Sequence, residues 1–200
     1  MFAYIKGILE EKSSNYVVVE TAGIGYKIFM GETAINTIGE IGEKVKVYTH
    51  YHVREDEISL YGFKTNEELR MFELLISVSG VGAKSALVTL SNIEPSSFAL
   101  AVITNDTSKL VKIPGIGAKT AARIILELKD KLKNEQAISN GNKKIKTVVI
   151  DNQKIEEAVS ALQVLGYNKK EIEKSLETID VNSLELEEII KQGLISLSKR

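Results

Sequence analysis

The sequence predicts a multidomain α+β protein with an N-terminal β-barrel, a central all-helical unit and a short helical module at the C-terminal end. Residues 1–63 are dense in strand-forming side chains, whereas residues 64–133 place their apolar side chains at helical spacing. Residues 151–200 contain three short helical stretches. Residues 134–150 are polar and poor in large apolar side chains, which predicts a flexible linker.

The overall composition is typical of a globular protein, with 44% hydrophobic and 26% charged residues in a chain of 200. No apolar run is long enough to predict a membrane-spanning helix. The sequence has no cysteine, which excludes disulfides and thiolate metal sites. The first residues lack the basic start and apolar stretch of a secretory signal, so we expect a cytoplasmic protein.

The charge is distributed unevenly along the chain, although the net formal charge is only -1. Residues 64–133 contain ten basic and seven acidic residues, a local charge of +3. Residues 1–63 and 151–200 each carry three more acidic than basic residues. Phosphate attraction depends on local charge, so the central unit is where we expect any nucleic acid to bind.

The first unit is expected to form about five short strands, with one helical turn near residues 33–37. Val45 and Val47 alternate with lysines, as in a strand with one buried face. Glycine-containing breaks at residues 22–25 and 38–42 separate the strand-forming runs. A small closed barrel, specifically an OB-fold, accommodates this pattern.

The helical units carry recognisable start and stop signals. Thr65 followed by Glu68 predicts a capping box that begins the first helix. Further helices are predicted over residues 95–103 and 108–113, and a longer one from Ala118. In the C-terminal module, Gly166 ends one helix, Asn168 with Glu171 caps the next, and Ser183 is predicted to begin the last. Val148, Val149 and Ile150 form an apolar patch in the linker to which the sequence assigns no role.

One internal repeat carries the chemistry. Residues 78–86 recur as residues 113–121, an offset of 35, and each copy lies between two predicted helices. The glycines permit a positive φ, and backbone N–H groups at a helix N-terminus favour an anion. Lys84 and Lys119 follow in the first helical turn, and Arg123 lies one turn later, where it can alternatively pair with Glu127. The predicted phosphate-binding residues are Gly80, Val81, Gly82, Lys84, Gly115, Ile116, Gly117, Lys119 and Arg123.

Other glycine-rich loops do not fit this spacing. A P-loop has glycine directly before the lysine, where Ala83 and Ala118 stand. The dinucleotide-binding fingerprint has a third glycine, where Ser85 and Thr120 stand. Two interpretations of the repeat are therefore left. The hairpins bind the phosphate backbone of a nucleic acid without reading its sequence, or they are purely structural turns between helices.

The two hairpins resemble tandem helix-hairpin-helix motifs, which grip both strands of a duplex across the minor groove. The chain as a whole resembles the RuvA family, the DNA-binding subunits of the bacterial Holliday-junction branch-migration complex. This resemblance covers barrel, hairpins, linker and a three-helix UBA-like module in that order. The segments that carry it are residues 23–26, 49–63, 113–123 and 127–130.

The resemblance implies a flat homotetramer, or an octamer, on which a four-way junction lies open. Glu55 and Asp56 match the acidic pin at the centre of such a tetramer, and Glu57 adds a third acid. The C-terminal module, with Leu162, Leu165 and Tyr167, matches the part that recruits the hexameric ATPase RuvB. The RuvC resolvase is a further implied partner. ATP and Mg would belong to the motor, and we expect no catalytic residues, metal or cofactor in this chain.

Each implied role has a plainer alternative. Three acids in a turn can be a solvated loop, and the apolar residues of the module can be its own core. His50 and His52 share one strand face without cysteines or clustered carboxylates nearby, so we expect surface or interface residues there.

Three other functions compete with junction binding. A helix-hairpin-helix DNA glycosylase needs a catalytic aspartate and a base pocket, and the first aspartate after Gly117 is Asp130. A single-strand or general DNA-binding accessory protein needs exposed aromatics on the barrel, for which Tyr48, Tyr51 and Tyr61 are candidates. A structural adaptor would use the hairpins only as packing turns.

Overall fold

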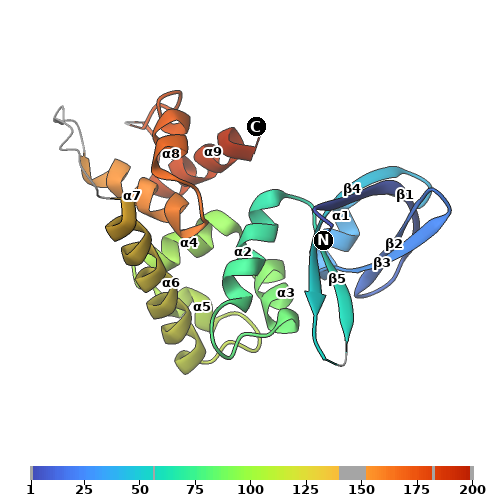
Figure 1. The fold of residues 1–200 in the computed structure, drawn as a ribbon. Helices are drawn as coiled ribbons and strands as arrows, with labels where there is room; N and C mark the ends of the chain where they lie inside the picture. Colours follow the sequence, from blue (N-terminus) through green and yellow to red (C-terminus); the bar gives the residue numbers. More distant parts are fainter. Residues whose placement is uncertain (1, 56, 140–151, 182, 199–200) are drawn as a thin grey trace.

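The computed structural model describes residues 2–55, 57–139, 152–181 and 183–198. A β-barrel lies on one side, and helices from the centre and the C-terminal end of the chain pack beside it (Figure 1). This arrangement confirms the predicted α+β multidomain class. No single helix in the described ranges is long and apolar enough to cross a membrane. Helices α3 (Ala83–Asn92) and α4 (Pro95–Ile103) meet that criterion only as a pair, which is bent by 101°.

The barrel is closed by five strands in the order β1-β2-β3-β5-β4. All neighbouring strands are antiparallel except β3 and β5, which are parallel and pair at Phe29 and Tyr61. The order is that of an OB-fold. The helical turn expected near residues 33–37 is α1. The elements are β1 (Tyr4–Lys12), β2 (Tyr16–Thr21), β3 (Ile24–Phe29), α1 (Glu32–Thr37), β4 (Lys44–Val53) and β5 (Ile58–Phe63).

Close approach of β1 and β2 depends on Gly7. A Cβ atom at this position would stand 2.0 Å from the carbonyl oxygen of Glu20, which is too close for any side chain. The barrel core is formed by alternate residues of the strands and by Ile35 of α1. Its buried members are Ile5, Leu9, Val17, Val19, Ile28, Met30, Ile35, Val45 and Val47.

The central unit contains five helices, and its first cap was predicted correctly. The Thr65 side chain accepts from the N–H of Glu68 at 3.2 Å, and the Glu68 carboxylate accepts from the N–H of Thr65 at 3.4 Å. The helix predicted at 108–113 lies slightly earlier, because Asp106 caps it by accepting from the N–H of Lys109. The helices are α2 (Asn66–Ile76), α3 (Ala83–Asn92), α4 (Pro95–Ile103), α5 (Thr107–Val111) and α6 (Ala118–Ser139).

Helix α6 extends into the first residues of the predicted linker. Helix α6 continues to Ser139, six residues into the segment that we expected to be flexible from residue 134. The residues added, Asn134 to Ser139, include Glu135, Gln136 and Ala137, which are good helix formers. The apolar patch at Val148, Val149 and Ile150 lies outside the described residues.

The C-terminal module consists of α7 (Asn152–Val164), α8 (Lys169–Leu176) and α9 (Leu186–Ser198). Gly166 follows α7 with a φ of 80°, and Asn168 and Glu171 form the predicted capping box. The prediction that Ser183 begins the last helix is wrong. Helix α9 begins at Leu186, and the Ser183 hydroxyl donates to the carbonyl of Asp180 instead of capping the helix.

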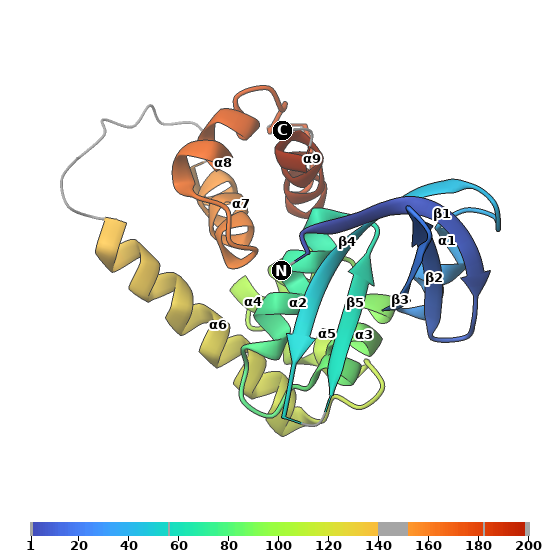
Figure 2. The same cartoon turned by 45° about the vertical axis from the view of Figure 1, so that its right-hand side comes forward.

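The module packs directly on the central helices, which the sequence did not predict. Helices α7 and α9 contact α4, and one continuous buried core extends from Tyr61 and Phe63 of β5 to Leu197 of α9. Both views show α7 and α9 beside the central helices, on the side away from the connection between β4 and β5 (Figure 2).

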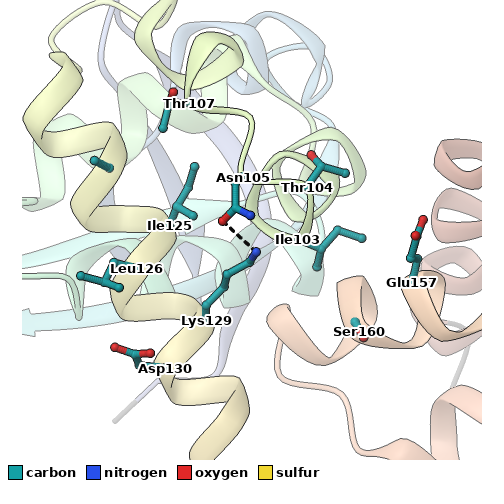
Figure 3. Close-up of a pocket in the computed structure, with 11 residues that line it drawn as sticks. Ile103, Thr104, Asn105, Thr107, Ile125, Leu126, Lys129, Asp130, Glu157 and Ser160 are labelled. Atoms are coloured by element: carbon teal, nitrogen blue, oxygen red, sulfur yellow. Dashed lines mark hydrogen bonds between the residues drawn. The ribbon is translucent and has the colours of Figure 1, made fainter.

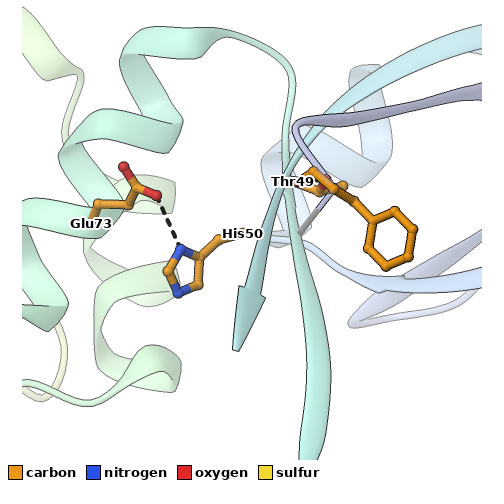
Figure 4. Close-up of polar contacts among 4 residues, drawn as sticks. Thr49, His50 and Glu73 are labelled. Atoms are coloured by element: carbon orange, nitrogen blue, oxygen red, sulfur yellow. Dashed lines mark hydrogen bonds and ion pairs between the residues drawn. The ribbon is translucent and has the colours of Figure 1, made fainter. Parts of the chain in front are cut away.

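Polar and aromatic contacts join the barrel to α2. His50 of β4 lies 3.1 Å from the Glu73 carboxylate of α2, and the neighbouring Thr49 hydroxyl donates to the carbonyl of Phe2 at 2.9 Å (Figure 4). The ring of Phe72 lies 4.9 Å from that of Phe63. These contacts set the orientation of the barrel relative to the helices. His50 is therefore an interface residue, as predicted.

Candidate nucleic-acid interface

The two copies of the repeat have the same backbone geometry. The N–H of Val81 donates to the carbonyl of Val78 at 3.1 Å, and the N–H of Ile116 donates to that of Ile113 at 3.0 Å. The glycines between these residues, Gly80 and Gly115, have φ values of 86° and 82°. A hydrogen bond from the fourth residue to the first, with a positive φ at the third, describes a type II turn. The repeat in the sequence is therefore a repeat in structure.

The second glycine of each copy is not required by packing inside the protein. No described atom lies within 4 Å of a Cβ built at Gly82 or Gly117, and neither residue has a positive φ. Both glycines are exposed at the start of a helix. No side chain caps the start of helix α3, so no side-chain cap accepts a hydrogen bond from its first backbone N–H groups. Open space beside uncapped N–H groups at a helix N-terminus is what a phosphate requires.

Val81 and Ile116 have a different role from the glycines. Their side chains are buried, 7% and 5% exposed, and their N–H groups already donate within the turns. They fix each hairpin to its helices, as predicted from their apolar character. Including them among the phosphate-binding residues is not supported, because neither the side chain nor the N–H is available.

Lys84 and Lys119 occupy the second position of α3 and α6, respectively, and both are exposed. Within the described ranges, no ion pair shorter than 4.0 Å involves either lysine. Each ammonium group can therefore reach an anion held at the N-terminus of its own helix without losing a protein partner.

Both hairpins lie at the same edge of the molecule as the connection between the end of β4 and the start of β5. In both views this is the lower edge, and the C-terminal helices lie at the upper one (Figures 1 and 2). Glu55, between β4 and β5, is exposed, whereas Asp56 lies outside the described residues. The Arg54 N–H donates to the Glu57 carbonyl at 2.8 Å and closes the connection. Glu57 is also exposed, and its carboxylate accepts from the Ser59 hydroxyl.

Arg123 is engaged by the protein itself. Its Nε lies 3.8 Å from the Glu127 carboxylate, and its Nη1 donates to the carbonyl of Ser79 at 3.3 Å. Glu127 in turn accepts from the N–H of Ser79 at 3.2 Å. The pairing with Glu127 that the sequence left open is present. The contact with the first hairpin, 44 residues away, could not be read from the sequence.

Family models match each of the three parts of this architecture. Residues 1–62 match the RuvA N terminal domain, residues 72–130 the SAM-like helix-hairpin-helix tandem, and residues 153–198 the RuvA C-terminal domain. The chain belongs to the RuvA family.

Relatives in this family are similar over their full length. A protein of Acetivibrio thermocellus named Holliday junction branch migration complex subunit RuvA is 53% identical, with 100% of both chains covered. The protein of the same name from Ruminiclostridium cellulolyticum is 49% identical over 98% of this chain and 100% of its own. The Clostridium perfringens protein is 44% identical over 97% and 98% of the two chains.

The residues that the RuvA resemblance assigns to the motor contact are buried here. Leu162 and Leu165 have no exposed surface, and Tyr167 is 6% exposed. Leu162 packs beside Gly193 of α9 and belongs to the core of the module, which is the alternative stated above. The Tyr167 hydroxyl donates to the Glu67 carboxylate of α2 at 2.9 Å. These three residues are therefore covered in this arrangement, and their assignment to the motor contact stays a prediction.

The three barrel tyrosines named as candidates for base stacking, Tyr48, Tyr51 and Tyr61, are all at least partly buried. Tyr61 is 7% exposed and lies 5.2 Å from Phe72, ring centre to ring centre. Tyr51 packs edge-on against Phe2 at 5.8 Å, and Tyr48 is partly buried beside Lys46. The geometry therefore gives little support to a single-strand binder that stacks bases on these side chains.

A groove of about 890 Å³ lies where α6 and α7 meet the connection between α4 and α5 (Figure 3). Lys129 crosses it to donate to the Asn105 side chain at 2.8 Å. Asp130 lines the groove, but it lies thirteen residues beyond Gly117, roughly 20 Å along the helix. None of the predicted site residues lines it. The groove is therefore poorly placed to receive a base from DNA held at the hairpins.

The described residues include no group of three or more histidine, cysteine, aspartate or glutamate side chains that could hold a metal ion. His52 lies near His50, and burial, with the neighbouring His50 and Arg54, lowers the pKa of its imidazole. The His52 ring lies edge-on to the Tyr61 ring, with ring centres 5.8 Å apart.

Proposed function

We propose that this chain is the junction-recognition subunit of a branch-migration complex. It binds four-way DNA independently of sequence, holds the junction open and recruits a RuvB-type hexameric ATPase for recombination and repair. The observation that carries the proposal is that two hairpins of matching geometry share one edge with an acidic connection between two strands. The names of the full-length relatives support the same assignment.

The grip is made through the phosphate backbone. Each hairpin offers the N–H groups at a helix N-terminus together with one lysine, Lys84 or Lys119. These groups recognise charge and shape, so the affinity does not depend on base sequence. Two hairpins on one rigid unit engage two strands of a duplex arm at the same time.

The acidic connection acts on the centre of the junction. Glu55 and Asp56 carry negative charge toward the crossover, where carboxylates repel phosphates and oppose stacking of the arms. Four copies in a homotetramer would surround the centre with such charges, and a second tetramer would complete an octamer. RuvC is a further partner that could act on DNA held open in this way.

The chain itself performs no catalysis in this proposal. ATP and Mg are bound by the motor, and this subunit holds no cofactor or metal of its own. It works in the cytoplasm, where the chromosome is accessible. The C-terminal module provides the link to the motor.

The first experiment compares binding to a synthetic four-way junction, the matching linear duplex and a single strand at one salt concentration with competitor DNA. We expect strong preference for the junction, independent of arm sequence. Equal binding to duplex would remove the junction role and leave the hairpins as general DNA-binding elements. Preference for single strands would favour the barrel as the binding surface, and no binding would return the hairpins to structural turns.

A second experiment tests the link to the motor. The ATP hydrolysis rate of a RuvB hexamer is measured on junction DNA with and without this chain. We expect stimulation that depends on both junction and chain. Junction binding without stimulation would contradict the recruiting role alone and leave junction recognition intact.

A further inference from the structure

Helix α6 begins at the second hairpin but contacts the first. Three of its side chains, each one turn after the other, reach the end of α2 and the turn that follows. Arg123 donates to the Ser79 carbonyl at 3.3 Å, and Glu127 accepts from the Ser79 N–H at 3.2 Å. Lys131 donates to the Ser77 hydroxyl. Both backbone groups of Ser79 are therefore held by one helix.

We propose that Arg123 and Glu127 are positioning residues that hold the first hairpin in a fixed relation to the second. This inference rests on the proposed function, because it concerns how two hairpins bind one duplex arm together. Arg123 thereby receives a role different from direct phosphate binding. Its guanidinium is shared between the Glu127 carboxylate and the Ser79 carbonyl.

The internal repeat shows that the hairpin fold does not itself require this contact. An offset of 35 residues places Pro114 at the position of Ser79, Val88 at that of Arg123 and Asn92 at that of Glu127. Pro114 has no N–H, so the second hairpin needs no acceptor at this point. The contact is therefore made in one direction only, from the helix of the second hairpin to the turn of the first.

The position of the contact suits a positioning role. Ser79 is the second residue of its turn and directly precedes Gly80, whose φ is positive. The N–H groups proposed to bind phosphate begin three residues after Ser79, at Gly82. Rotation of the turn about its ends would displace these groups, and two linked contacts bind best when their spacing is set before binding.

Replacing Glu127 tests the proposal, because the electrostatic effect and the positioning role predict opposite changes in DNA affinity. It is an acid close to a surface that binds phosphates, so removal of its charge should strengthen DNA binding by electrostatics alone. The positioning role predicts the opposite effect when the acceptor is lost with the charge. Glu127→Gln removes the charge but keeps an oxygen acceptor for the Ser79 N–H, whereas Glu127→Ala removes both.

The experiment measures duplex and junction affinity of the full chain for these two variants. We expect Glu127→Gln to bind at least as well as the wild type and Glu127→Ala to bind on the order of tenfold more weakly, the equivalent of one hydrogen bond to a charged group. Alanine and glutamine are both good helix formers, so α6 should remain folded in both. Equal affinities of the two variants would overturn the proposal.

Ser79→Pro approaches the same contact from the other side. It removes the N–H that Glu127 accepts from, together with the serine hydroxyl, and proline already occupies the equivalent position in the second hairpin. We expect a loss similar to that of Glu127→Ala with no change in net charge. Wild-type affinity in a folded Ser79→Pro protein would contradict the positioning role.

A double-mutant cycle identifies the hairpin that is affected. Once Lys84→Ala has weakened the first hairpin, Glu127→Ala should cost little more, whereas its effect should add fully to that of Lys119→Ala. Additivity with both lysine variants would overturn the proposal. If neither lysine variant alone changed DNA binding, the proposed function would fail instead, so the two failures are distinguishable.

Discussion

Tyr167 of the C-terminal module donates a hydrogen bond to Glu67 of α2 over 2.9 Å, and both residues are buried although 100 positions separate them in the sequence. Arg70, one turn after Glu67, donates to the carbonyl of Gly166 at 2.8 Å. Its guanidinium also lies 4.2 Å from the centre of the Tyr167 ring. Two residues of α2 thus hold the turn between α7 and α8.

The hydrogen bond should contribute measurably to stability. Tyr167→Phe removes the hydroxyl and leaves a buried carboxylate without this donor, which we expect to cost about 1–3 kcal/mol of unfolding free energy. Chemical denaturation would show this as a lower midpoint. Tyr4→Phe is the control, because Tyr4 is 52% exposed on the barrel. Equal midpoints for the Tyr167→Phe protein and the wild type would contradict the contact.

The same contact predicts a pH dependence in the alkaline range. Burial, with the neighbouring Glu67 carboxylate, raises the pKa of Tyr167 above its ordinary value near 10. The folded protein keeps this proton where the unfolded chain has lost it. The stabilisation is therefore complete below about pH 10 and is lost as the pH rises above that value.

Denaturation of wild type and Tyr167→Phe at several pH values measures this effect. We expect the difference in unfolding free energy to stay constant up to about pH 9. Above about pH 10 it should decrease by up to about 1.4 kcal/mol per pH unit. The comparison removes the contributions of the other tyrosines and the lysines, which titrate in both proteins. A difference that persists unchanged through about pH 11 would argue against a buried phenol.

Docking of the module should compete with motor binding through the residues proposed for it. Leu165 and Tyr167 face α2 in this structure, so a motor that contacts them requires the module to separate from α2. Glu67→Ala should weaken docking and strengthen binding of the RuvB hexamer several-fold, measured by titration without DNA. Glu73→Ala on the same helix is the control, since Glu73 contacts His50 instead. Weaker motor binding by Glu67→Ala would contradict this competition.

The glycines of the second hairpin should separate folding from binding. Gly115 has a φ of 82°, so Gly115→Ala should destabilise the protein by about 1–2 kcal/mol. Gly117 has open space around its Cα and no positive φ, so Gly117→Ala should fold normally. It should nevertheless weaken DNA binding, because the added methyl group occupies the phosphate position. Thermal unfolding measures the stability of both variants, and duplex affinity measures their DNA binding. Wild-type affinity of Gly117→Ala would remove that glycine from the interface.

The acidic connection should control specificity more than affinity. The double variant Glu55→Gln, Asp56→Asn removes two negative charges near the proposed centre of the junction. We expect duplex binding to be maintained or to improve, while the preference for junction over duplex falls. Competition between the two DNA forms at one salt concentration measures the ratio. An unchanged ratio would remove the pin role from these residues.

Local patterns in the sequence were sufficient for the elements and for the hairpins. The repeat at 78–86 and 113–121 predicted two turns of equal geometry, because glycine spacing and turn type are local properties. The caps at Thr65 and Asn168 were predicted for the same reason. The end of α6 and the start of α9 were not, since helix ends depend on competing local contacts such as that of Ser183 with Asp180.

The sequence by itself determined the fold class and the two hairpins. Only the tertiary structure decided which residues face one another across long separations: Glu67 and Tyr167, and Ser79 with Arg123 and Glu127. Charged and aromatic side chains at such positions look like ordinary surface residues in a sequence. Their partners are set by how helices pack, and packing is a property of the whole chain that no local spacing encodes.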